Sequence, residues 1–384
     1  MNMNIFINDI ASFLPNQPVD NDRIEEILGR IGNIPSRTRR RILANNKITT
    51  RYYALDPETG RTTHTNAQLT AEAVRKLRPS AEFSLTDIEC LCCGSASPDL
   101  LMPGHGVMVA GELGLAPCEV VTTAGICLAG VTALKYACLN VATGAVQNAV
   151  ATGSEIASSY MNAGFFAAET EPEDDLQKKP ILGFDADFLR WMLSDGAGAA
   201  FISGRKSATG LCYRVEWIEN RSYAGELVTC MYAGGRKLDD GRMQGWRDGQ
   251  GSLAAAGQNL MAVRQDVKLL DTHIVPTAMA RALPAIAEKH GLRPDDIDWY
   301  LPHYSSDYFR DRFYQGMKGA GFEIPYEKWF TNLYEVGNIG SASIYLLMEG
   351  LLKSGRLRDG DRVLCFVPES GRFSHSFMLL TVIA

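Results

Sequence analysis

Residues 127–144 have the sequence CLAGVTALKYACLNVATG, and residues 338–355 have the sequence NIGSASIYLLMEGLLKSG. Each stretch opens with small residues, continues with a hydrophobic face of helical period, and ends at a glycine 17 positions after its first residue. Glycine commonly follows the last turn of a helix because it adopts the left-handed conformation without strain. The two stretches, 211 positions apart, therefore predict two equivalent helices, each followed by an apolar strand.

A second pair of segments repeats at nearly the same distance. Residues 67–96 and 282–305 each pass from an amphipathic helix through a break into an apolar strand, and their Asp-Ile-Glu and Asp-Ile-Asp tripeptides lie 209 positions apart. Two pairs in the same order predict two copies of one unit, over 1–205 and 206–384, with helices covering mostly parallel sheets. No linker rich in Pro, Gly or Ser separates the copies, so we expect one pseudo-symmetric α/β body.

The composition is that of a soluble enzyme or binding protein with a large core. The chain has 384 residues, of which 46% are hydrophobic and 21% charged, and its net charge of −6 disfavours a nucleic-acid partner. No apolar run approaches the roughly 20 residues of a membrane helix. The N-terminus lacks the basic region of a signal peptide, and Ile5–Ile10 predicts a strand instead. We therefore expect a cytoplasmic protein without a membrane span.

The nine cysteines are irregularly spaced, and no second cluster of Cys or His completes a zinc site. We expect no bound metal and mostly reduced, buried thiols. Cys127 is the exception because it stands at the head of a predicted helix, where the macrodipole is expected to lower its pKa and favour the nucleophilic thiolate.

Two further polar residues are predicted at equivalent ends of strands and helices. His303 follows the predicted strand at 298–302, and Asn338 heads the helix that matches the Cys127 helix. Under the internal symmetry Cys127 and Asn338 face each other across one site, and strand ends are where α/β proteins bind ligands. A thiol nucleophile with a His and an Asn as hydrogen-bond donors to a thioester oxygen suits acyl transfer followed by attack of a carbon nucleophile.

The motifs resemble those of the thiolase superfamily, and within it the ketoacyl synthase III-type condensing enzymes, over nearly the whole chain. LSDGAGAAFIS at 193–203 resembles the glycine-rich strand of the family, LPHYSS at 301–306 its His motif, and GNIGSAS at 337–343 its Asn motif. The resemblance implies a five-layered αβαβα fold, a homodimer and transient acylation of Cys127. Acyl-coenzyme A or acyl carrier protein thioesters would be substrates, with no bound cofactor.

The resemblance also implies further site residues. The oxyanion hole would be formed by the backbone N–H groups of Cys127 and Gly371. Arg51, in NKITTRYYA (46–54), matches an Arg of the family, and we expect it to bind substrate together with Phe373. Met102, which precedes Pro103 in a loop toward the dimer partner, would close an acyl tunnel.

Departures from the family pattern suggest a more specialised reaction. The family has a run of glycines before Phe373, and this chain has Ser370-Gly371-Arg372. Glu155 ends the strand after the Cys127 helix and is the counterpart of this loop in the other half. We expect Arg372 to bind a β-keto oxygen or a carboxylate, or to orient Glu155, and Glu155 to act as a base on a carbon between two carbonyls. A structural Glu–Arg pair or a capping carboxylate is the alternative.

With these departures, the opening segment 7–29 resembles the ketosynthases that make dialkylresorcinols and cyclohexanediones in bacteria. The predicted function is carbon–carbon bond formation between an acyl group on Cys127 and a β-ketoacyl thioester, followed by cyclisation. The alternatives are an acyltransferase that makes an ester or amide with His303 as base, a simple decarboxylative condensing enzyme, and a non-catalytic scaffold subunit. The basic cluster at 37–41 could contact an acidic carrier protein or coenzyme A phosphates.

Overall fold

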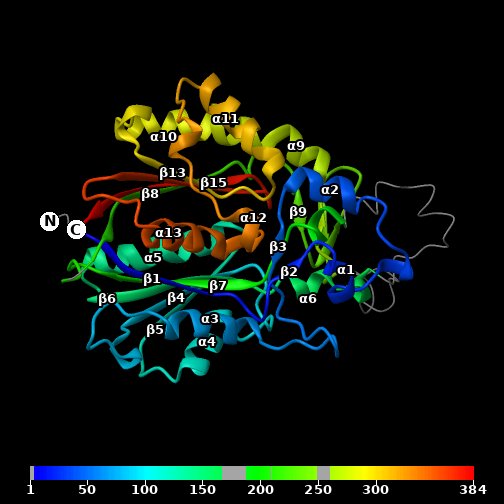
Figure 1. Ribbon diagram of the computed structural model, residues 1–384, viewed down its shortest axis with the longest axis horizontal. Coiled ribbons are helices and arrows are strands. Elements are labelled where there is room, and N and C mark those ends of the chain that lie inside the picture. The colour runs from blue at the N-terminus through cyan, green and yellow to red at the C-terminus, as the bar shows by residue number, and fades with distance from the viewer. Residues whose placement is uncertain (1–3, 167–186, 209, 249–259) are drawn as a thin grey trace.

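Nine strands form one continuous sheet whose two arms lie on opposite sides of two central helices (Figure 1). The computed structural model describes residues 4–166, 187–208, 210–248 and 260–384. The strand order is β13-β14-β15-β8-β1-β7-β6-β4-β5. These strands are β1 (Phe6–Phe13), β4 (Cys90–Ser95), β5 (Glu119–Ala124), β6 (Asn148–Glu155), β7 (Gly196–Ser203), β8 (Cys212–Ser222), β13 (Trp299–Pro302), β14 (Arg362–Glu369) and β15 (Ser374–Ile383).

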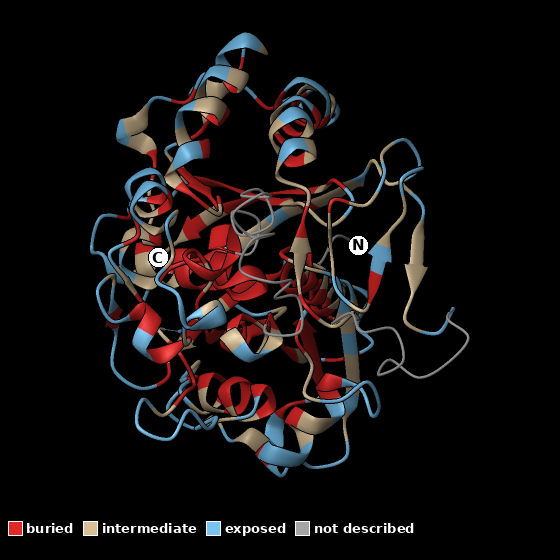
Figure 2. Ribbon diagram, turned by 90° about the vertical axis from the view of Figure 1, so that its right-hand side faces the viewer, coloured by how far each residue is buried: buried red, intermediate tan, exposed pale blue. Residues whose placement is uncertain are grey.

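Helices complete a five-layered arrangement, as the sequence predicts. In Figure 1, α9, α10 and α11 cover one arm of the sheet, α3 and α4 cover the other, and α5 and α13 lie between the arms. These helices are α3 (Asn66–Arg75), α4 (His105–Leu113), α5 (Leu128–Thr143), α9 (Val267–Val275), α10 (Leu283–His290), α11 (Arg310–Gly319) and α13 (Ser343–Lys353). Figure 2 shows buried residues gathered on the central helices and exposed ones on the outer helices. None of the described helices has the length and apolar character needed to cross a membrane.

Shorter elements surround this frame, mostly at the end where the central helices begin. They are α1 (Ile24–Ile27), α2 (Arg39–Asn46), α6 (Ser158–Met161), α12 (Leu333–Val336), β2 (Val19–Asp20), β3 (Thr50–Arg51), β9 (Met231–Tyr232), β10 (Gly235–Lys237), β11 (Met243–Gly245) and β12 (Arg264–Gln265).

The expectation of mostly parallel sheets is wrong. Among the described strands of the long sheet, β4 pairs in parallel with β5 and β6, and β13 with β14, while the other neighbours are antiparallel. A parallel pair needs a crossover of about a dozen residues or more. Residues 370–373 alone connect β14 to β15, so these strands must run antiparallel. The N-terminal strand is confirmed, as β1, and runs antiparallel to β7 and β8.

The predicted repeat is visible in the order of elements. Helix α3 and strand β4 correspond to α10 and β13, and α5 and β6 correspond to α13 and β14. All strands of one arm come from residues before 205 and all strands of the other from residues after 206, although the boundary itself stays a prediction. One detail differs: α13 begins at Ser343, so Asn338 does not head the helix but lies in a turn before the 3-10 segment Gly340–Ala342.

Glycines bring this turn against the helix that starts at Cys127. A Cβ on Gly130 of α5 or on Gly153 of β6 would lie 2.3 Å from the carbonyl oxygen of Ser341. No side chain fits at either position, so the two glycines allow the backbone of the 338–342 turn to pack directly onto α5 and β6. This packing places Asn338 close to Cys127.

Candidate active site

Three predicted residues converge on one small cavity. Cys127 is the N-cap residue of α5, His303 follows β13, and Asn338 lies in the turn before α13. All three are buried and line a cavity of about 50 Å³. The rest of its wall is mainly apolar and comes largely from α9, from α11 and from the residues just before them; it includes Leu270, Ile274, Phe309 and Phe313. The site therefore joins a thiol to two polar side chains at the end of a hydrophobic chamber.

The Asn338 side chain is oriented by its own turn. Its Oδ1 accepts a hydrogen bond from the N–H of Gly340 at 2.9 Å. The backbone N–H of Asn338 donates to the carbonyl of Met192 at 3.0 Å, and its carbonyl accepts from the N–H of Ser194 at 2.9 Å. With Oδ1 occupied, the Nδ2 amide is the group that Asn338 can offer to a ligand.

His303 is a neutral imidazole at physiological pH. Its backbone N–H donates to the carbonyl of Phe366 at 2.8 Å, which fixes the residue at the end of β13. Burial lowers the pKa of His303 to about 4, because the charged form is poorly solvated in this apolar chamber. A neutral ring has one N–H to donate, and it is a weak base.

The expected lowering of the Cys127 pKa is wrong. Burial raises the pKa of the thiol well above its usual value, and the carboxyl groups of Glu369 and Glu155 raise it further. The position at the head of α5 is as predicted, but Glu369 lies at the same helix end. Its Oε2 accepts from the N–H groups of Ile126 and Leu128, both at 3.0 Å, so a negative charge offsets the positive end of the helix dipole.

A larger cavity of about 440 Å³ adjoins the first. Both cavities are lined by Ile126, Leu193, Met231, Asn338 and Gly340. The larger cavity also contains the polar groups of Glu155, Glu369 and Arg372, with apolar walls that include Ala157, Tyr160, Met161 and Val263. A ligand in the larger cavity would therefore also contact Asn338, which lines both cavities.

Glu155 is a buried carboxyl with several donors. Ser97 donates its hydroxyl to Oε2 at 2.6 Å, the N–H of Ala96 lies 3.1 Å from Oε1, and the N–H of Ser341 lies 3.3 Å from Oε1. Burial nevertheless raises the pKa of Glu155 to about 7. A carboxyl with this pKa is divided between its acid and base forms at neutral pH, as proton-transfer catalysis requires.

Arg372 does not pair with Glu155. Its Nε donates to the carbonyl of Leu227 at 2.8 Å, and the side chain reaches the wall of the larger cavity from an exposed position. The alternative of a structural Glu–Arg pair is thus wrong, although both residues line one cavity. The alternative of a capping carboxylate agrees with the backbone N–H groups of Ala96 and Ser341 that Glu155 accepts. Gly371 lines the same cavity, and its carbonyl accepts from the N–H of Cys230 at 2.9 Å. Its role in an oxyanion hole stays a prediction.

The structure places two predicted substrate contacts in the protein interior. Arg51 is fully buried, where its Nε and Nη2 donate to the carbonyl of Trp191 and its Nη1 donates to Asn21 at 2.6 Å. Phe373 is also fully buried, in the hydrophobic core. Neither lines a cavity around Cys127, so both assignments are corrected to structural roles: a guanidinium so engaged has little left for a ligand.

Met102 occupies a different environment. It is 73% exposed, next to Leu101 at 70%, and lies outside the cavities that contain Cys127 and Glu155. In the single chain it closes no tunnel. Its predicted role requires a partner chain and stays a prediction.

Sequence reasoning missed Glu369. The residue lies next to Ser370 and Gly371, in the segment that departs from the family pattern. In this segment the sequence predicts site roles for Gly371 and Arg372 but none for Glu369. The available signal was a carboxylate at the end of an otherwise apolar strand, VLCFVPE. The apolar wall of the small cavity was also missed, because Leu270 and Phe313 contribute to helices whose faces cannot be assigned to a cavity from periodicity alone.

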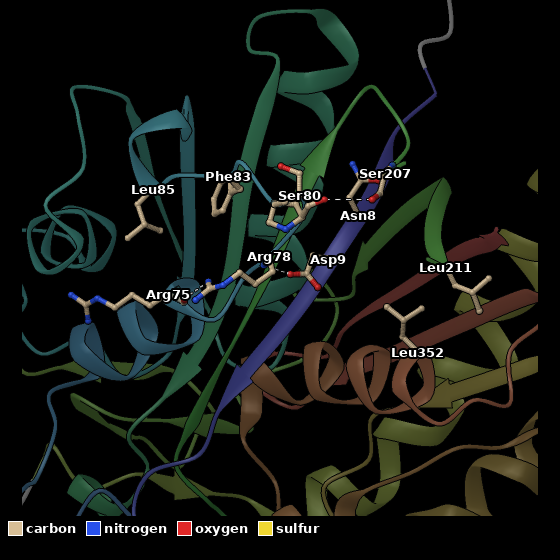
Figure 3. A pocket seen from close by; sticks show the side chains of 12 residues that line it. Asn8, Asp9, Arg75, Arg78, Ser80, Phe83, Leu85, Ser207, Leu211 and Leu352 are labelled. Carbon is tan, nitrogen blue, oxygen red and sulfur yellow. Dashed lines mark hydrogen bonds between the residues drawn. The ribbon is translucent and has the colours of Figure 1, made fainter. Parts of the chain in front are cut away.

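A wider surface hollow lies elsewhere on the molecule (Figure 3). It has a volume of about 710 Å³ and is lined by residues such as Asp9, Arg75, Arg78 and Phe83. Arg75 binds Glu72 and the carbonyl of Glu112, and the N–H of Arg78 binds Asp9. These polar groups already form hydrogen bonds within the protein. None of the residues predicted to be catalytic lines the hollow.

Comparison with known proteins finds a matching family and similar proteins. Residues 287–377, which include His303, Asn338 and Gly371, match the family described as 3-oxoacyl-[acyl-carrier-protein (ACP)] synthase III C terminal. The chain is 26% identical over 300 residues to beta-ketoacyl-[acyl-carrier-protein] synthase III of Sphingopyxis alaskensis, covering 78% of this chain and 79% of that protein. It is 22% identical to the protein of the same name from Clostridioides difficile, covering 95% and 94%.

Solved structures share the fold. AbyA1, a tetronic acid condensing enzyme, superimposes with a TM-score of 0.73 at 21% identity, covering 98% of this chain and 99% of the other. A Xanthomonas campestris OleA variant solved with lauric acid and lauroyl-CoA gives a TM-score of 0.74 at 20% identity, covering 99% and 100%. At this identity the likeness concerns the fold alone, and it confirms the predicted thiolase-like αβαβα architecture.

Proposed function

Because the chain is a ketoacyl synthase III-like protein of the thiolase superfamily, we propose that it condenses two acyl thioesters through an acyl group carried on Cys127. The observation that carries the proposal is the convergence of Cys127, His303 and Asn338 on one apolar cavity that adjoins a larger one. The small cavity, of about 50 Å³, suits a short acyl group on Cys127, and the larger cavity suits the second thioester. The relatives named above are beta-ketoacyl-[acyl-carrier-protein] synthases, which favours a carrier-protein thioester as one substrate.

In the loading step, the sulfur of Cys127 attacks the thioester carbonyl, and the thiol proton leaves with the displaced coenzyme A or carrier thiol. The tetrahedral oxyanion needs two donors. Within the described part of the chain, the backbone N–H groups of Cys127 and Gly371 donate to no backbone carbonyl, and that of Cys127 interacts with its own sulfur, which supports their assignment to this role. His303 and the Nδ2 of Asn338 would then bind the carbonyl of the second thioester.

In the condensing step, the second substrate is a β-ketoacyl thioester whose carbon between two carbonyls is acidic. Glu155 takes that proton, the carbanion attacks the acyl carbonyl, and the sulfur of Cys127 leaves and regains a proton. A pKa near 7 and a place in the larger cavity support Glu155 as this base. Arg372, in the same cavity, would bind the β-keto oxygen. Cyclisation of the product to a cyclohexanedione or dialkylresorcinol precursor follows in this proposal.

The ester- or amide-forming alternative receives less support. That reaction would require His303 to remove a proton from an alcohol or amine. A histidine whose pKa is about 4 is a poor base at neutral pH. A simple decarboxylative condensation remains the alternative in which Glu155 has no catalytic role.

The proposed enzyme acts as a homodimer. Strand β5 lies at the edge of the long sheet, and its side chains are half-buried or exposed in the single chain. Leu100, Leu101, Met102 and Val107 are exposed nearby in sequence. An open sheet edge flanked by exposed apolar residues favours pairing with a second copy.

Intact-mass spectrometry after mixing the protein with a panel of acyl thioesters tests the proposal. The wild-type chain should gain the mass of one acyl group, and Cys127→Ala should gain none. An adduct that persists in Cys127→Ala, or no adduct on the wild-type chain with any donor, would overturn the mechanism. Isolation of a product with a new carbon–carbon bond then separates condensation from ester or amide formation.

A further inference from the structure

Glu369 binds the backbone on both sides of the nucleophile. One carboxylate oxygen, Oε2, accepts the N–H of Ile126 and the N–H of Leu128, each at 3.0 Å. The acceptor is more than 240 positions away in sequence, so this cap of α5 is a tertiary contact rather than a local one. Between the two bound groups lies the N–H of Cys127, which among the described residues interacts with its own sulfur and donates to no backbone carbonyl.

On the wall of the larger cavity, the Glu369 carboxyl packs closely against two glycines. A Cβ on Gly125 would lie 3.3 Å from Oε2, and a Cβ on Gly371 would lie 3.4 Å from Oε1 and 3.0 Å from the Cδ1 of Ile126. The carboxyl of Glu369 thus packs between two glycines, one before Cys127 and one in the loop with the second proposed oxyanion donor. The Glu369 side chain thus contacts both the segment before Cys127 and the loop that contains Gly371.

We propose that Glu369 is a positioning residue that holds the 126–128 backbone so that the N–H and the sulfur of Cys127 both serve the smaller cavity. This inference rests on the proposed function, because it takes Cys127 as the nucleophile. Because the Glu369 carboxylate accepts the N–H groups of Ile126 and Leu128, only the N–H of Cys127 between them is left to bind an oxyanion. The loop after β14 packs Gly371, whose N–H is the second proposed oxyanion donor, against the same carboxylate.

The same contact controls the charge state of the thiol. The ionisable groups around Cys127 are Glu369 at the end of β14, Glu155 at the end of β6 and His303 after β13, which is neutral. Burial raises the pKa of Glu369 while the N–H groups of Ile126 and Leu128 lower it, and the ionised form disfavours a thiolate beside it. Cys127 is therefore a thiol at neutral pH, protected from reagents that need a thiolate, and it loses its proton only as the leaving thiol takes it up.

Two variants separate position from charge. Glu369→Gln keeps a side-chain oxygen that accepts both N–H groups but removes the charge. The pH profile of Cys127 alkylation by iodoacetamide, followed on the peptide by mass spectrometry, should move about one unit lower, so that alkylation is about tenfold faster at a fixed pH below the midpoint. Glu369→Asp keeps the charge but falls short of the backbone, so acylation should slow about tenfold while the alkylation profile stays alkaline.

Glu288→Gln is the matched control, because Glu288 is exposed on α10 and far from these contacts. Its alkylation profile should equal that of the wild-type protein. A Glu369→Gln profile that also equals the wild-type profile overturns the proposal, as does wild-type acylation in Glu369→Asp. If even the wild-type chain accepts no acyl thioester, the proposed function fails, while the alkylation comparison still decides the role of Glu369. Circular dichroism confirms folding of each variant.

Discussion

Glu155 carries the ring-forming hypothesis at the level of a single side chain. Burial raises the pKa of its carboxyl to about 7, while Ser97 and two backbone N–H groups hold it in place. Glu155→Gln should leave the acyl adduct on Cys127 but lower formation of the condensed and cyclised product by about 10²–10⁴-fold, because the base is lost. Product analysis by liquid chromatography and mass spectrometry, with the adduct measured in parallel, provides the comparison.

The pH dependence of the same step has a defined sign. Glu155 must be deprotonated to accept a proton, so the rate of the condensing step should rise as the pH increases through about 7. The Ser97→Ala variant removes a hydrogen bond that stabilises the carboxylate, and should move this rise to higher pH. A flat profile between pH 6 and 8, in the presence of preloaded enzyme, would return Glu155 to a structural role.

The sequence predicts which residues lie in the site when their position follows from the repeat. It does not predict properties that depend on burial or on residues far away in the chain. Cys127, His303 and Asn338 were found because repeat spacing places them at element ends. The direction of the Cys127 pKa shift could not be predicted, because it depends on burial and on a carboxylate more than 240 residues away. Arg51 matched a motif, but a motif match does not reveal that the guanidinium is fully buried against a backbone carbonyl.

At the scale of elements, α11 and the short 3-10 segment before it form one wall of the smaller cavity. Phe313 is buried there and packs edge-on against Phe366. Phe313→Leu should enlarge the cavity and shift loading of Cys127 toward acyl groups longer by a few carbons, at a cost of roughly 1–3 kcal/mol in the free energy of unfolding. Competition between acyl thioesters of different length, read by intact mass, measures the shift.

Phe322→Leu is a suitable control for the change in stability. Phe322 is buried in the same hydrophobic cluster but lies outside the cavity wall. A loss of stability without a change in chain-length preference is expected for this variant. The same preference in both variants would mean that Phe313 does not limit the acyl chain.

Helix α2 presents the predicted basic cluster to solvent. Arg37, Arg40 and Arg41 are exposed, whereas Arg39 is engaged with Glu25 at 3.0 Å. The ion pair of Lys47 with Asp307 at 2.6 Å joins the end of α2 to the segment that carries Phe309 of the smaller cavity. This arrangement favours a contact with an acidic carrier protein close to the site.

Reversing two of these charges tests that contact. The double variant Arg40→Glu, Arg41→Glu should raise the KM for a carrier-protein thioester about tenfold and change little with the small coenzyme A thioester of the same acyl group. The difference should shrink at high salt because exposed charges are screened. Equal effects on both donors would indicate that α2 contacts coenzyme A or supports the fold instead.

Elements themselves were predicted better than their pairing. The helices α3, α5 and α10 and the strands after them follow from apolar periodicity, and α5 and α10 also from their glycine ends. The antiparallel majority was missed, because pairing direction depends on connection lengths and on distant strands that no local pattern contains. Likewise, the helix matching α5 begins at Ser343 rather than Asn338, since the turn before it is shaped by contact with Gly130 and Gly153.

For the whole molecule, the open edge at β5 predicts association. Leu101→Asp with Met102→Lys should shift the protein from dimer to monomer in size-exclusion chromatography with light scattering, because charges would be placed in an apolar contact. Ile34→Asp, at a residue that is 39% exposed on another part of the chain, is the control and should not change the mass. A monomeric wild-type protein would contradict the proposed homodimer.

Strand β1 has a consequence for how the chain is made. It precedes the other strands of the long sheet in the chain, yet its partners are residues 197–203 of β7 and Tyr213 and Arg214 of β8. At about 5–20 residues per second on the ribosome, β1 waits on the order of 10–40 s with both edges unpaired. The junction between the two arms of the sheet thus forms late, and until then the nascent chain exposes an unpaired strand that molecular chaperones are suited to protect.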